Sequence, residues 1–133
     1  MVDASVLAPA LSDDDPSGDL ARARIAHVAL AAPQIIDLEV ISVLRRAARS
    51  RRLAPRRAQQ AVDDLLVLDL HRVPHKPLLP RVWQLRDTLS AYDASYVALA
   101  EHLAVPLVTA DRNLARAAGV HCQVELLPPT ASR

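Results

Sequence analysis

The sequence of 133 residues contains no phenylalanine, one tryptophan and two tyrosines. A surface that stacks successive bases of a single-stranded nucleic acid needs more aromatic side chains than this. Cys122 is the only cysteine, so the chain has neither an internal disulfide framework nor a cysteine-based metal site. We expect Cys122 to be a small buried side chain on a late strand.

Long apolar runs are also missing. No segment approaches the roughly 18 apolar residues needed to span a membrane, and the N-terminus lacks the basic and apolar blocks of a signal peptide. We therefore expect a cytoplasmic protein with no membrane partner. The length suits one domain with a sizeable core, which we place at residues 1–127, followed by a flexible tail at residues 128–133.

Short apolar segments alternate with helical patterns along the chain. Strands are predicted at residues 1–2, 27–30, 70–73, 106–110 and 120–126, and residues 12–18 resemble a turn. Helices are predicted at residues 19–26, 35–52, 55–68, 78–89 and 92–104, and a short one runs through Ala118 to Gly119. This alternation predicts an α/β fold with a mostly parallel sheet flanked by helices.

Two acidic residues directly follow predicted strands. In an open parallel sheet, ligands bind beyond the carboxyl ends of the strands, and both Asp3 and Asp111 should lie at that edge. Each of them is equally suited to cap the helix that follows it, because aspartate is a favoured N-cap residue. Position alone leaves both interpretations open.

The predicted helix that begins at Ile35 is apolar nearly all round, which indicates a buried central helix. Its polar residues Glu39, Ser42, Arg46 and Arg49 fall on one narrow stripe. A buried carboxylate needs a cation, a hydrogen-bond partner or a raised pKa. Arg46 lies about two turns, or ~10 Å, from Glu39 along the axis. We therefore expect a metal ion, or an arginine from elsewhere, beside Glu39.

Asp93 projects from the apolar stripe of the helix predicted at residues 92–104. Ser90 and Asp93 have the spacing of a capping box, and a capping carboxylate can still present an oxygen to a cation. Clustered carboxylates repel one another unless a positive charge lies among them. Hard divalent cations take such oxygen ligands, and a pair of them can stabilise both reacting oxygens of a phosphodiester.

Four segments, taken in order, resemble the motifs of PIN domains: Val2–Ser5, Pro33–Glu39, Ala91–Ala100 and Leu107–Asp111. Within that family, the compact single-domain form resembles the VapC toxins of bacterial toxin–antitoxin pairs. The resemblance implies a PIN-like α/β/α sandwich and an endoribonuclease that arrests translation and growth. It implies one or two Mg²⁺ or Mn²⁺ ions, and it assigns the metal-binding, catalytic role to Asp3, Glu39, Asp93 and Asp111.

The resemblance also implies roles for neighbouring polar residues. Ser5 and Thr109 match hydroxyl positions that orient the carboxylates or a metal-bound water, and Asn113 stands where some relatives carry a further acid. Homodimerisation and a cognate VapB-like antitoxin, bound in a hetero-oligomer, are further implications. Arg46, Arg49 and Arg112 are then candidates for contact with RNA or antitoxin.

Seven arginines lie between residues 45 and 57. They suit phosphate contact, or a solvated helix end where cations favour the dipole, and we interpret most of them as the latter. Trp83 is interpreted as a core or dimer-interface residue. A catalytically inactive PIN-like binding module and a DNA-directed or structure-specific nuclease remain alternatives. A haloacid-dehalogenase-type phosphatase is set aside because Ser5 occupies the position of its second aspartate.

Overall fold

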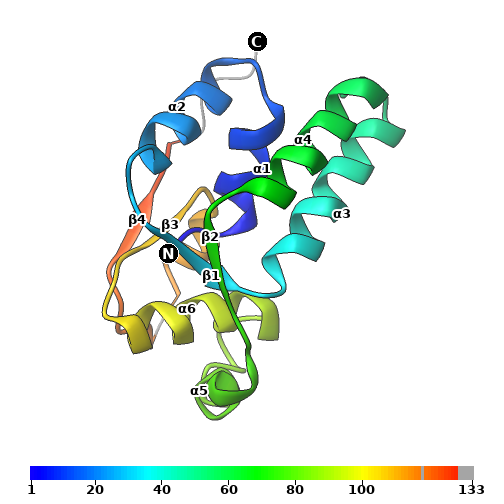
Figure 1. Cartoon of the computed structure of the whole chain (residues 1–133). Helices are drawn as coiled ribbons and strands as arrows, with labels where there is room; N and C mark the ends of the chain where they lie inside the picture. Colours follow the sequence, from blue (N-terminus) through cyan, green and yellow to red (C-terminus); the bar gives the residue numbers. More distant parts are fainter. Residues whose placement is uncertain (118, 129–133) are drawn as a thin grey trace.

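The computed structural model describes residues 1–117 and 119–128 (Figure 1). Helices and strands alternate along most of this chain, which confirms the predicted fold class. In chain order the elements are α1 (Ala4–Ser12), α2 (Pro16–Ile25), β1 (Leu30–Pro33), α3 (Ile36–Arg49), α4 (Pro55–Val67), β2 (Leu70–Val73), the 3₁₀-helix η1 (Lys76–Leu78), α5 (Leu79–Gln84), α6 (Ala91–Leu103), β3 (Leu107–Thr109), α7 (Arg112–Ala115) and β4 (Val124–Leu126).

The strands are parallel. β1 pairs with β2, and β3 pairs with β4. The first residues of the chain join these two pairs, because the Val2 amide donates to the Ala31 carbonyl and the Val108 amide donates to the Met1 carbonyl. Hydrogen bonding therefore runs in the order β2, β1, residues 1–3, β3, β4. The carboxyl ends of all these segments meet at one edge, as the sequence predicts.

Helices cover the strands on both sides. In Figure 1, α6 runs below the strands, whereas α1 and α2 lie above them. α6 packs against β1 and β3, and α1 packs against β3, α3 and α4. The core between these layers contains Leu7, Ile36, Tyr96, Leu99 and Leu107, all of them fully buried. No helix in residues 1–117 and 119–128 is both long and apolar enough to cross a membrane.

Several predicted boundaries are wrong. α1 occupies residues for which no helix was predicted, and it continues through Pro9. β1 lies three residues later than expected, after a left-handed backbone turn at His27 (φ 63°). The helix predicted to end at residue 89 ends at Gln84. β4 begins only at Val124, so Cys122 precedes the strand and is half-buried rather than buried. Residues 118 and 129–133, which include most of the expected tail, lie outside the described residues.

α3 is not buried all round. Ile36, Val40 and Leu44 are buried on one face, but the side chain of Leu38 is 65% exposed and Ile41 is also exposed. The run of apolar residues therefore does not mark a central helix. α3 is a surface helix with one buried face, and it carries exposed apolar side chains near its N-terminal end.

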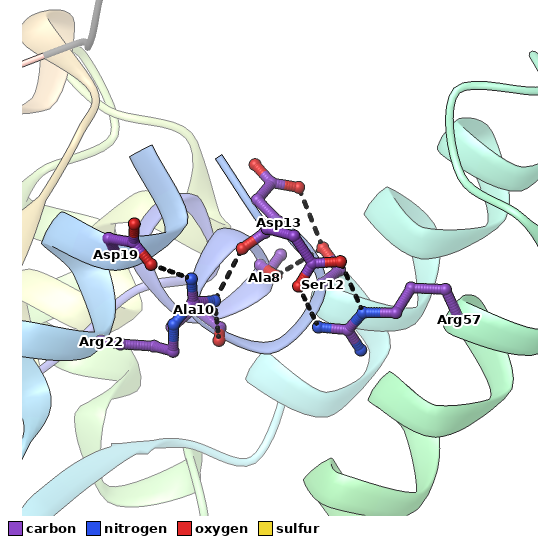
Figure 2. Close-up of polar contacts among 8 residues, drawn as sticks. Ala8, Ala10, Ser12, Asp13, Asp19, Arg22 and Arg57 are labelled. Carbon is purple, nitrogen blue, oxygen red and sulfur yellow. Dashed lines mark hydrogen bonds and ion pairs between the residues drawn. The ribbon is translucent and has the colours of Figure 1, made fainter. Parts of the chain in front are cut away.

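The corner between α1 and α2 is fixed by an arginine (Figure 2). The Arg22 guanidinium donates to the carbonyl oxygens of Ala10 (3.1 Å) and Asp13 (2.7 Å). These carbonyls lie at the C-terminal end of α1, where helical partners are lacking. On the other side of the corner, Arg57 of α4 pairs with Asp14 at 3.3 Å. The corner thereby holds α1, and with it the residues at the start of α1, against its neighbours.

Candidate active site

Asp3 lies at the carboxyl edge of the sheet, between the first strand segment and α1. Its side chain is 6% exposed and caps α1 by accepting a hydrogen bond from the Ser5 amide at 3.1 Å. The Ser5 hydroxyl donates to Oδ1 at 2.5 Å, and the Thr109 hydroxyl donates to Oδ2 at 2.5 Å. Both carboxylate oxygens are therefore oriented by hydroxyl donors, one from α1 and one from β3.

The same hydroxyls tie the end of β3 to Asp3. The Ala110 amide donates to Ser5 Oγ at 2.8 Å, and the Asp111 amide donates to Thr109 Oγ1 at 3.0 Å. Ser5 Oγ and Thr109 Oγ1 lie 3.3 Å apart. The resemblance put Ser5 beside the first acid and Thr109 before the last one, and in the structure both hydroxyls contact Asp3. The backbone of Asp111 is held through Thr109.

Asp111 and Asp93 both stand at helix starts. Asp111 caps α7 by accepting from the Asn113 amide at 2.8 Å, so its predicted capping role is confirmed. The exposed residue Asn113 takes part in this contact through its backbone. Ser90 caps α6 by accepting from the Asp93 amide at 3.1 Å. A residue at a capped helix start can therefore also lie at the acidic edge, as the sequence allowed.

The carboxylates influence one another. Burial raises the pKa of Asp93, and the charge of Asp111 raises it further, against a smaller opposing contribution from Ser90. Burial also raises the pKa of Asp3; the hydroxyls of Ser5 and Thr109 oppose this, and the charge of Asp93 adds to it. Each of these acids is thus harder to ionise than an isolated aspartate, as expected where carboxylates gather without a cation.

Glu39 has a partner that the sequence did not predict. The Tyr96 hydroxyl donates to Glu39 Oε1 at 2.6 Å, so this carboxylate has a hydrogen-bond donor from the core. Among the residues that the structure describes, no arginine pairs with Glu39. Tyr96 is 1% exposed, and its pKa is raised first by burial and then by Glu39, with smaller contributions from Asp3 and Asp93. The Tyr96 phenol therefore stays protonated and always donates this hydrogen bond. Glu39, Asp3 and Asp93 all lie close enough to act electrostatically on this phenol.

Tyr96 was not among the site residues predicted from the sequence. One signal could have singled it out, because a buried tyrosine usually finds a hydrogen-bond partner for its hydroxyl. Tyr96 lies one helical turn after Asp93, on the face that packs into the core. The Tyr96 hydroxyl thus needed a polar group on a neighbouring element, and Glu39 of α3 supplies it.

The acidic side chains are spread along the edge of the sheet and do not converge on a single point. Among residues 1–117 and 119–128, no three histidine, cysteine, aspartate or glutamate side chains lie close enough to hold one ion together. The candidate ligands are nevertheless all carboxylates, and hydroxyl groups orient those of Asp3 and Glu39. Carboxylate oxygens are the ligands that hard divalent cations take. Mg²⁺ is usually bound through one or two carboxylates and keeps several waters. The residues present therefore fit a hydrated Mg²⁺ or Mn²⁺ ion.

The candidate contact residues lie in different surroundings. Arg46 lines a groove with Glu39 and Ser42, which agrees with the predicted stripe, whereas Arg49 and Arg112 are exposed. Trp83 is 67% exposed, with the Arg86 guanidinium 4.4 Å from the ring centre. The core interpretation of Trp83 is therefore wrong, and an interface role stays a prediction.

Comparison with known proteins identifies the family. Residues 1–120 match the family model of the PIN domain. The chain belongs to the PIN domain family. Among curated PIN-type relatives, Ribonuclease VapC1 and Ribonuclease VapC9 of Mycobacterium tuberculosis are each 40% identical over 128 residues. These alignments cover 96% of this chain, 96% of VapC1 and 98% of VapC9. The resemblance to VapC toxins is thereby confirmed.

Solved structures agree on the PIN fold. PAE2754 from Pyrobaculum aerophilum superimposes with a TM-score of 0.67 at 25% identity, over 92% of this chain and 80% of that one. VapC20 of Mycobacterium tuberculosis, described as a sarcin-ricin loop cleaving toxin, also gives 0.67, at 18% identity over 90% and 94% of the two chains. The predicted PIN-like architecture is therefore confirmed.

Proposed function

We propose that this PIN domain is a metal-dependent endoribonuclease that acts as the toxin of a toxin–antitoxin pair. The observation that carries the proposal is the group of Asp3, Asp93 and Asp111 at the carboxyl edge. Burial raises the pKa of Asp3 and of Asp93, and a neighbouring charge adds to each shift, that of Asp93 on Asp3 and that of Asp111 on Asp93. Such a group suits a divalent cation. Relatives named ribonucleases across nearly the whole chain support RNA as the substrate.

Each acidic residue has a support that keeps it in place. Ser5 and Thr109 hold both oxygens of Asp3, and Tyr96 holds Glu39. With one or two Mg²⁺ or Mn²⁺ ions bound by Asp3, Glu39, Asp93 and Asp111, the site would gain an activated water and charge stabilisation for phosphodiester hydrolysis. The fixed carboxylates contribute positioning, which is most of what such a reaction requires of the protein.

The partners follow from the same comparison. The VapC names of the relatives support a VapB-like antitoxin as a partner. We further propose that the chain forms a homodimer and, with the antitoxin, a hetero-oligomer. RNA cleavage would then arrest translation and growth in the cytoplasm. We retain Arg49 and Arg112 as candidates for contact with RNA or antitoxin because both are exposed cations and Arg112 directly follows Asp111.

The decisive experiment is cleavage of cellular RNA by the purified chain. The Asp93→Asn variant should lose cleavage in Mn²⁺, and EDTA should abolish cleavage by the unmodified chain. Asp87→Asn is the matched control, because Asp87 is an exposed acid outside this group. Unchanged cleavage by Asp93→Asn contradicts the mechanism. Absence of cleavage by the unmodified chain favours an inactive binding module, and preferential cleavage of DNA favours the other alternative.

A further inference from the structure

A groove leads away from the acidic edge along α3. It has a volume of ≈ 350 Å³ and is lined by Ala4, Leu38, Glu39, Ser42, Arg46 and Tyr92, among others. Ala4 and Tyr92 are the chain neighbours of Asp3 and Asp93, so the groove opens directly beside the acids. In Figure 1 the start of α3 lies near the start of α6, and both helices contribute lining residues to the groove.

The far end of the groove is cationic. Arg46 is two helical turns, or ~10 Å, from Glu39 along α3, so it is too distant to neutralise that carboxylate. Among the described residues, no carboxylate pairs with the Arg46 guanidinium. Arg45 is equally exposed on the same helix, but it does not line the groove. Within the described part of the chain, Arg46 is thus a cation without an ion-pair partner in the lining of a groove that begins beside the acids.

One wall of the groove is aromatic. Tyr92 is 60% exposed, so it is accessible to a bound molecule. The ring also borders a second, apolar pocket lined by Ile35, Leu79 and Val82. A groove that offers both an aromatic face and a cation can bind a nucleotide, because the ring stacks on the base and the cation contacts the phosphate.

We propose that the groove between Tyr92 and Arg46 binds one nucleotide of the RNA strand next to the scissile phosphate. The base stacks on Tyr92, and the phosphate beyond it contacts Arg46. This subsite rests on the proposed nuclease function and adds the residues that hold the strand. A single tyrosine is sufficient for it, although the chain has too few aromatic residues for an extended stacking surface.

RNA fits the groove better than a protein partner does. An apolar protein segment would bury the exposed side chains of Leu38 and Tyr92, but it would leave the Arg46 guanidinium without an anionic partner. A strand of RNA uses the whole length of the groove. Its scissile phosphate meets the acidic end, and its next phosphate meets the cationic end.

The test uses the Asp93→Asn chain, which we expect to bind RNA without cutting it, and a fluorescent dodecamer of uridine as the probe. Anisotropy at several salt concentrations gives the affinity and its salt dependence. Adding Tyr92→Leu should weaken binding roughly fivefold to 100-fold, as expected for one lost stacking contact, and Tyr92→Phe should restore it. Trp83→Leu, which removes another exposed aromatic side chain, is the control.

Arg46→Gln should weaken binding and lower the slope of log affinity against log salt by about 0.7, the value for one phosphate contact on a single strand. Arg45→Gln, with the same change of charge one residue away, should lower that slope by less. An abasic oligomer should remain sensitive to Arg46→Gln and become insensitive to Tyr92→Leu, because it offers phosphates without bases.

Three results would overturn the subsite: no binding of the dodecamer at low salt, equal effects of the Arg45 and Arg46 changes, or a Tyr92→Leu effect on the oligomeric state rather than on RNA affinity. The last result would assign the groove to a protein partner. Loss of the subsite with RNA cleavage intact leaves the nuclease function standing, so the two proposals fail separately.

Discussion

The hydrogen bond from Tyr96 to Glu39 gives a prediction with a definite size. Replacing Tyr96 with phenylalanine removes one oxygen from a fully buried side chain, and that oxygen lies 2.6 Å from Glu39 Oε1. Hydrogen bonds to charged groups contribute about 1.5–3 kcal/mol. Glu39 is half-buried and regains water when the phenol is lost. We therefore expect a cost of about 1.5 kcal/mol, at the lower end of that range.

The assay is equilibrium unfolding in urea with EDTA present, so that no bound metal contributes. The midpoint should fall without a change in slope, and Tm should fall by roughly 5 °C for a domain of this size. A double-mutant cycle with Glu39→Ala isolates the pair and should give a coupling of about 1 kcal/mol or more. Additivity of the two single changes within about 0.3 kcal/mol would refute the reasoning.

Two further predictions concern stability. The folded-state pKa of Asp93 lies above the usual 3.8. Between these two pKa values the metal-free folded chain therefore binds more protons than the unfolded chain. Its free energy of unfolding should fall as the pH rises from 3.8 through the raised pKa. In urea titrations with EDTA, Asp93→Asn should lessen this fall; an unaltered pH profile would contradict the assignment. Gly18→Ala places a Cβ 1.9 Å from the Asp13 carbonyl oxygen, and we expect a loss of about 1–3 kcal/mol, measured as a lower Tm; an unchanged Tm would show that the corner relaxes freely.

The sequence predicts the elements that depend on local chemistry. α6 begins after the Ser90 cap as expected, α4 begins at Pro55, and Asp111 follows β3 and caps the next helix. α1 was missed because Pro9 lies inside it. Proline ordinarily argues against a helix interior, and only tertiary packing reveals that it is tolerated here.

The site was predicted in part for the same reason. Asp3 and Asp111 could be placed at one edge because strand ends in a parallel sheet must meet there. The partner of Glu39 could not be predicted, since Tyr96 lies 57 positions away in the sequence. The exposure of Leu38 could not be predicted either, because hydrophobicity alone does not show which face of a helix packs against another element.

The proposed nuclease activity depends on a divalent metal ion at the acidic edge. Isothermal titration calorimetry with Mn²⁺ tests this metal site most directly, because it detects metal binding without an RNA substrate and gives the number of bound ions. Binding should be saturable in the unmodified chain and in Asp87→Asn. It should be lost or greatly weakened in Asp93→Asn. Equal binding by all three chains, or no binding by the unmodified chain, would contradict the proposed metal site.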